Sequence, residues 1–164
     1  MLLGTILEGF VVRGTWDTAA ALVNKITGRQ IEIISPRPDE HLQSPEPLGQ
    51  GLSYLVTGKL KHLPKNHEIW LLVEQLVTRC VWPQGFSRVV FDPARKSWSG
   101  RINPSVSGAR RGPVKIIAVV APPTSQDLFN YFRQLGTMLH HDFVPLSRVP
   151  PECQNTAFVQ ARVP

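Results

Sequence analysis

Residues 81–100 have the sequence VWPQGFSRVVFDPARKSWSG, in which proline, glycine and aspartate separate short segments of aromatic and β-branched residues. Pro83 has no amide hydrogen to donate, so residues 82–84 are predicted to lie at a strand end or a sheet edge. Asp92 followed by Pro93 favours a type I turn, so residues 92–97 are predicted to form a hairpin turn before a strand that starts at Trp98. This stretch therefore predicts short strands joined by tight turns.

The same pattern extends over residues 30–163. Strands are predicted at 31–34, 52–57, 68–77, 79–84 (which 87–91 continue or follow), 98–102, 114–120 and 156–163. Gly58 is expected to end the second strand, and residues 37–50 are expected to form an irregular loop. About seven short strands with regular turn signals predict a mainly β fold, an immunoglobulin-like antiparallel β-sandwich.

Residues 68–77 form the most hydrophobic run, which predicts a central strand with both faces covered. Trp70, in the middle of this run, is expected to anchor the core between the two sheets. After Pro122 and Pro123 the apolar period becomes helical, which predicts one inserted helix at about 124–136. Thr124 or Ser125 is its expected N-cap, Asp127 is expected in the first turn, and Gly136 is expected to end it.

Residues 1–29 are predicted to be a separate helical segment that precedes the sandwich domain, residues 30–164. Two apolar stripes lie on nearly opposite faces and change sides at Gly14, which predicts two short helices or one kinked helix. This segment is expected to pack on its own domain or on a partner, through an apolar face that comprises Leu3, Leu7, Phe10 and Trp16. Residues 2–12 at a membrane interface are the alternative, which the lack of a basic polar face disfavours.

The formal net charge of +6 is unevenly distributed, because residues 1–50 carry four basic and six acidic side chains and residues 51–164 carry fourteen and six. A basic surface attracts nucleic acid, anionic lipid or an acidic protein, although basic loop residues also serve solubility alone. The candidate anion-binding residues are Arg88, Arg95, Lys96, Arg101, Arg110 and Arg111.

The sequence predicts no catalytic residues, no metal site and no cofactor. The adjacent side chains of His140 and His141 point to opposite faces of an extended chain, which disfavours a metal site with Asp142. Cys80 is expected to be a packed thiol within a strand. Two cysteines are too few for a disulfide scaffold, and no signal peptide or membrane-spanning run is recognised, so a cytoplasmic location is expected.

The order of core and turn residues also resembles a known class of domain. The segments concerned are Ile31-x-Ile33-x-Ser35-Pro36, Tyr54-x-Val56-x-Gly58, 69–73, Trp82-Pro83-Gln84, Trp98-Ser99-Gly100 and 116–120. Over residues 31–122 and the last strand, the chain resembles the immunoglobulin-like accessory sandwiches of bacterial multidomain proteins. The resemblance implies a non-catalytic module that displays surfaces or docks other domains, and it carries over no catalytic residues.

The expected function is therefore that of a non-enzymatic binding or assembly module, whose N-terminal helices mediate self-association or docking to a protein partner. One alternative is a basic accessory protein that binds nucleic acid. A second alternative is an effector that associates with membranes through the N-terminal helices.

Overall fold

The computed structural model describes residues 31–48, 51–84, 88–104, 112–138, 144–153 and 155–164. The elements in chain order are β1 (Ile31–Ser35), β2 (Glu46–Leu48), β3 (Gly51–Leu60), β4 (Glu68–Glu74), β5 (Val81–Gln84), β6 (Val90–Asp92), β7 (Ser97–Ile102), β8 (Gly112–Ala121), α2 (Pro123–Met138) and β9 (Asn155–Val163). The predicted N-terminal helices and their apolar face lie outside the described residues.

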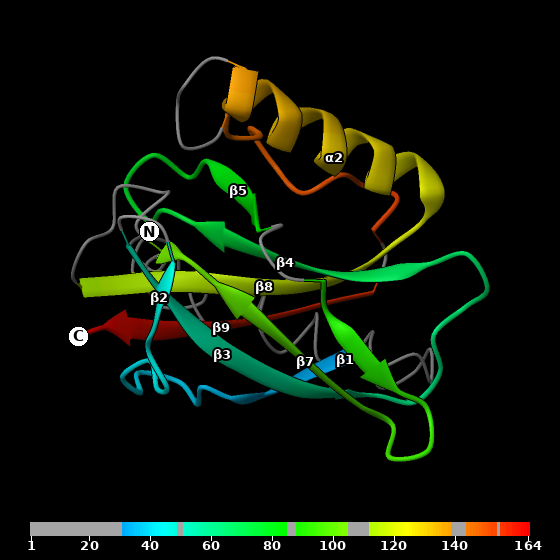
Figure 1. Cartoon of the computed structure of the whole chain (residues 1–164), viewed down its shortest axis with the longest axis horizontal. Helices are drawn as coiled ribbons and strands as arrows, with labels where there is room; N and C mark the ends of the chain where they lie inside the picture. The colour runs from blue at the N-terminus through cyan, green and yellow to red at the C-terminus, as the bar shows by residue number, and fades with distance from the viewer. Residues whose placement is uncertain (1–30, 49–50, 85–87, 105–111, 139–143, 154) are drawn as a thin grey trace, which may run out of the picture.

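The strands form two antiparallel sheets. Sheet A has the order β1-β3-β7-β6, with β2 paired to β3, and sheet B has the order β5-β4-β8-β9. Figure 1 shows α2 at the top of the molecule, with β4 and β8 lying between it and β3. A mainly β fold with two antiparallel sheets, compatible with a β-sandwich, is therefore confirmed.

The first of two cores lies between the sheets. Alternate side chains of the longer strands point into it, so Val56 and Trp98 of sheet A share one apolar cluster with Leu71 and Ile116 of sheet B. Trp98 is 2% exposed, and its indole Nε1 donates to the Lys59 carbonyl at 3.3 Å. A buried indole with a satisfied N–H anchors this core.

The second core lies on the other side of sheet B, beneath α2. Trp70 and Leu72 of β4 point into it together with Ile117 and Val119 of β8, and Phe129 of α2 fills its centre. The rings of Trp70 and Phe129 lie 5.1 Å apart at an angle of 47°. The prediction that β4 is covered on both faces is confirmed. The placement of Trp70 between the sheets is wrong, because its position in the alternation of β4 points it toward the helix.

Helix α2 extends the predicted helix at both ends. Pro123 suits the first helical position because its fixed φ matches the helix and no amide hydrogen is lost. The carbonyl of Pro122 accepts from the amides of Ser125 and Gln126 at 3.0 Å each, so the helix begins before the predicted caps. Asp127 consequently lies beyond the first turn. The helix also continues through Gly136, which is buried, to Met138.

Strand β3 continues past Gly58, where the sequence predicted its end. A side chain at this position would collide with the Trp98 ring and with the Glu32 carbonyl, because Gly58 lies between β1 and β7 under the indole. The glycine therefore makes room for the tryptophan and does not end the strand.

The predicted irregular loop at 37–50 contains more order than expected. Residues 46–48 form β2 along the start of β3. Upstream, the amide of Asp39 donates to the Gln160 carbonyl at 2.8 Å, and the amide of Leu42 donates to the Arg162 carbonyl at 2.8 Å. The loop thus satisfies backbone groups at the free edge of β9, which would otherwise be open to pairing with another chain.

The hairpin in the opening stretch is confirmed. Strand β6 pairs with β7 across residues 93–96, and the Asp92 carboxylate accepts from the amides of Ala94 and Arg95 at 2.9 and 3.0 Å. This is the local hydrogen bonding that favours Asp at the first position of a turn. Strand β5 lies at the edge of sheet B, as Pro83 predicted.

Candidate binding surfaces

No described helix crosses the outer face of sheet A. Its residues alternate with the side chains of the inter-sheet core and come from four strands: Glu32, Ile34, Leu55, Thr57, Lys59, Val90, Asp92, Ser97, Ser99 and Arg101. The apolar members are 41% exposed at Ile34, 37% at Leu55 and 64% at Val90. A shallow hollow of about 460 Å³ lies along the face between β1, β3, β6 and β7. The outer face of sheet A therefore exposes both apolar and polar side chains.

The three candidate anion-binding arginines that the structure describes each have an acidic partner. Arg88 Nη2 lies 2.7 Å from Glu68 Oε1, and Arg95 Nε lies 3.7 Å from Asp92 Oδ2. Arg101 Nη2 lies 2.6 Å from Glu46 Oε1 and also donates to the Ser44 carbonyl at 3.0 Å. Exposed ion pairs of this kind contribute little to stability, but each one reduces the charge offered to an anion.

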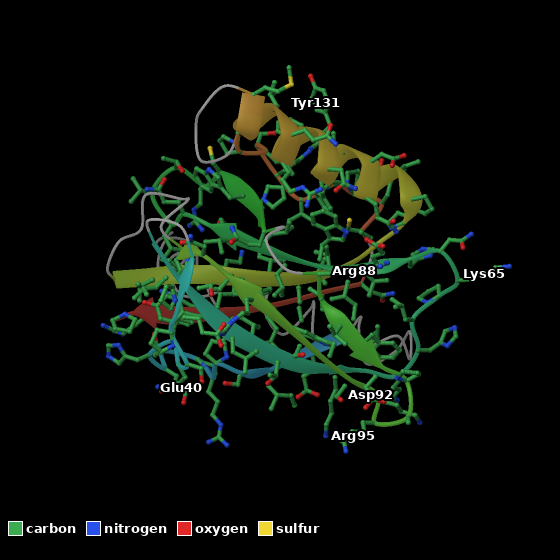
Figure 2. All side chains as sticks on the ribbon, viewed as in Figure 1. Glu40, Lys65, Arg88, Asp92, Arg95 and Tyr131 are labelled. Atoms are coloured by element: carbon green, nitrogen blue, oxygen red, sulfur yellow. The ribbon has the colours of Figure 1, made fainter. Side chains whose placement is uncertain are left out.

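These basic residues are also separated in the fold. Arg95 and Lys96 lie in the β6–β7 turn, whereas Arg101 lies near the opposite end of β7, and four residues of strand span roughly 13 Å. Figure 2 shows Arg88 in the middle of the molecule and Arg95 at the tip of the turn. Arg110 and Arg111 lie outside the described residues. Their joint role in anion binding stays a prediction.

A cavity of about 320 Å³ opens between α2 and the adjoining ends of β4 and β5. Its polar lining comprises Glu68, Trp70, Gln84, Arg88, Asn130 and Arg133. Gln84 is 4% exposed, and its side chain accepts from the Asn103 amide at 2.7 Å and donates to the Trp82 carbonyl at 3.2 Å. The indole Nε1 of Trp70 is buried without an acceptor among the described residues.

A second hollow of about 330 Å³ lies farther along sheet B, and no residue of α2 lines it. Its charged residues are Glu74, Arg79, Lys115 and Arg148. No local sequence pattern predicted this set, because its members come from four separate segments. The available signal was Glu74 itself, a charged residue at the end of a continuous apolar run.

The two cysteines are free and differ in exposure. Cys80 lies in the turn before β5 and not within a strand, and it is half-buried, whereas Cys153 is buried in the helix-side core. Burial raises the pKa of the Cys153 thiol, the Ser125 hydroxyl acts weakly in the opposite direction, and the Glu152 carboxylate adds to the increase. The Ser125 hydroxyl is buried and has no partner within normal hydrogen-bond geometry, so its contact with Cys153 is weak. The site is therefore a packed neutral thiol.

Within the described ranges, no three His, Cys, Asp or Glu side chains are grouped so that they would hold a metal ion. His140, His141 and Asp142 fall outside those ranges. No helix in the described part of the chain, α2 included, is long and apolar enough to span a membrane.

Comparisons of this chain with family models, with curated proteins and with solved structures gave no match.

Proposed function

We propose that this chain is a non-enzymatic binding module with an immunoglobulin-like sandwich, which associates with a second copy of itself through the outer face of sheet A. The observation that carries the proposal is the exposure of Ile34, Leu55 and Val90 on a sheet face that no described element covers. Apolar area of this kind contributes about 25 cal/mol per Å² when it is removed from water.

The immunoglobulin-like assignment rests on strand order. Constant-type immunoglobulin domains have strands A, B, E and D in one sheet and C, F and G in the other. Sheet A has the corresponding order β1-β3-β7-β6, and sheet B has β5-β4-β8-β9, in which β5 takes the place of an added C′ strand. Helix α2 would then be an insertion between strands F and G.

The charges of sheet A favour a second copy as the occupant. On this side of the sheet and at its adjoining turn, the acidic side chains of Glu32, Glu46 and Asp92 are balanced by the basic side chains of Lys59, Arg95 and Arg101. A surface with equal numbers of both signs is complementary to itself under two-fold rotation, in which each residue contacts its counterpart's neighbour. A strongly acidic or basic partner gains nothing from such a face.

The size of the face sets the expected affinity. Four strands spaced about 4.8 Å apart, with about six residues each, offer roughly 400 Å², half of the ~800 Å² per partner in a stable interface. Sheet A alone would therefore support only a weak dimer. We propose that the apolar N-terminal residues contribute the remaining area: Leu3, Leu7, Phe10 and Trp16.

The test is the molar mass of the full chain in solution across a range of concentrations. We expect a mass above the 18.3 kDa of one chain, and a shift to the monomer in Leu55→Glu, which replaces one of the exposed apolar side chains of the face with a charge. Lys65→Glu is the matched control, because Lys65 projects from the end of the molecule away from this face (Figure 2).

A fragment of residues 30–164 tests the N-terminal contribution, and we expect it to be folded and monomeric. A full chain that is monomeric at every concentration, or a Leu55→Glu variant with unchanged mass, would overturn self-association through sheet A. Loss of all folded structure in the fragment would instead assign residues 1–29 to the core.

A further inference from the structure

The hollow around Glu74 is assembled by strand register from four separate segments. Glu74 of β4 lies directly opposite Lys115 of β8 and Val81 of β5. Val81 in turn exchanges backbone hydrogen bonds with Leu146, at 2.9 and 2.8 Å. This bridge brings the next two residues, Ser147 and Arg148, to the rim of the same hollow.

Arg79 reaches the hollow from the β4–β5 turn. Its φ of 60° is in the left-handed region, which is uncommon for a residue with a side chain. The turn holds this conformation, because the Arg79 amide donates to the Gln75 carbonyl at 2.9 Å and the Gln75 amide donates to the Cys80 carbonyl at 3.2 Å. Residues in this backbone conformation occur often at ligand-binding sites.

The Glu74 carboxylate, 10% exposed, holds two of the cations in place. Its Oε1 lies 3.2 Å from Arg79 Nη1, and its Oε2 lies 2.9 Å from Lys115 Nζ. Lys115 Nζ also lies 4.8 Å from the centre of the Phe158 ring, so the ammonium group is fixed from two sides. Glu74 is thus a positioning residue that directs an arginine and a lysine to one place.

The charges around the hollow do not balance. One carboxylate faces three cations, and Arg148 has no ion pair or hydrogen bond to any described side chain. The excess of two positive charges matches a phosphate monoester, which carries about −1.5 to −2 near pH 7. Arginine and lysine donors, together with a serine hydroxyl at the rim, are the groups that bind phosphate oxygens in proteins.

We propose that this hollow is a binding site for the phosphate group of a small phosphorylated molecule, held by Arg79, Lys115 and Arg148. Its volume of about 330 Å³ admits the phosphate with part of the group to which it is attached. The site lies on sheet B and does not depend on association through sheet A.

The test is calorimetric titration of the full chain with pyrophosphate, with sodium chloride at matched ionic strength as the reference. We expect saturable binding of pyrophosphate, weakened roughly tenfold or more in Arg148→Gln, because a charge-assisted hydrogen bond is lost. Lys65→Gln is the control, because it removes one positive charge from an exposed side chain of the β3–β4 loop, at the end of β4 remote from Glu74. The affinity of this variant for pyrophosphate should equal that of the parent chain. Arg148 is itself exposed, so both variants should unfold at the temperature of the parent chain.

Equal responses to pyrophosphate and chloride, or equal affinities in Arg148→Gln and the parent chain, would overturn the proposal. A single-stranded oligonucleotide identifies the source of the phosphate. Competition between the oligonucleotide and pyrophosphate would support the phosphate site and extend it to nucleic-acid backbones. Oligonucleotide binding without saturable binding of pyrophosphate, and with equal affinity in Arg148→Gln and the parent chain, would overturn the proposal and assign the positive charge to a nucleic-acid surface elsewhere.

Discussion

The outer faces of the two sheets differ in what lies on them. On sheet B, Trp70, Leu72 and Ile117 point outward and are buried by α2. On sheet A, the outward positions are exposed or half-buried and include both apolar and polar side chains, as in Leu55, Thr57 and Lys59. The positions between them point inward and are buried. A strand that is covered on both faces becomes a continuous apolar run, whereas a strand with one open face keeps the alternation of period two. The two sequence patterns thus record which face is covered within this chain.

The largest expected effect is a pair of matched charge substitutions. Leu72→Glu places a carboxylate in the fully buried core beneath α2, where we expect a loss of more than about 4 kcal/mol or complete unfolding. Leu55→Glu places the same group on the open face of sheet A and should cost the monomer less than about 1 kcal/mol. Urea denaturation of both variants measures the difference. Similar losses in the two variants would mean that the faces are equally covered.

The contribution of the helix to this cover is tested by Phe129→Ala. Phe129 is fully buried and packs on Trp70, so the substitution should reduce the free energy of unfolding by about 3–5 kcal/mol. Tyr131→Ala is the control on the same helix, because Tyr131 is 58% exposed and points away from the sheets (Figure 2). A loss below about 1 kcal/mol in Phe129→Ala would show that α2 packs loosely on sheet B.

A smaller effect is expected within sheet A, at Gly58→Ala. The added methyl group would meet the Trp98 ring and the Glu32 carbonyl, so both the ring and the backbone of β1 must move, at a cost of about 3 kcal/mol. Ser99→Ala, on the outward side of the neighbouring strand, should change stability by less than about 0.5 kcal/mol. Chemical denaturation with near-ultraviolet circular dichroism reports both stability and the environment of the tryptophan. An unchanged midpoint in Gly58→Ala would contradict the tight contact.

The smallest expected effect concerns the thiol in the helix-side core. Because burial raises the pKa of Cys153, the folded state keeps its proton at a pH where the unfolded chain loses it. The resulting stabilisation is present below the ordinary value of 9.0 and is lost as pH rises above it, by at most about 1.4 kcal/mol per pH unit. Cys153→Ala should show a shallower decrease in stability between pH 9 and 10.5. Identical pH profiles for the variant and the parent chain would contradict a buried, neutral thiol.

Much of the fold could be predicted from local patterns. Pro93 specifies its turn through its fixed φ, and Asp92 does so through a side-chain hydrogen bond to the Ala94 amide. Pro83 specifies a strand at a sheet edge because it has no amide hydrogen to donate. Trp70 shows where such reasoning fails. A tryptophan in a doubly buried strand has two cores available, and the choice depends on its register in β4 relative to both sheets.

The candidate sites were less accessible to sequence reasoning. The cluster of arginines in residues 88–101 predicted a shared basic surface, but Glu68, Asp92 and Glu46 each pair with one of them. Glu68 and Glu46 lie 20 and 55 positions away in the chain, so no local pattern includes them. The hollow around Glu74 has the same origin, since strand pairing and the bridge between Val81 and Leu146 bring its cations together.

The sequence by itself determined the mainly β class, the hairpin at residues 92–97 and one helix before the last strand, because turn chemistry and apolar period act between near neighbours. Only the tertiary structure decided which tryptophan lies between the sheets, which sheet face stays open and which charges meet. Those outcomes depend on strand register and on pairing between residues tens of positions apart, where a shift of one residue moves every side chain to the other face.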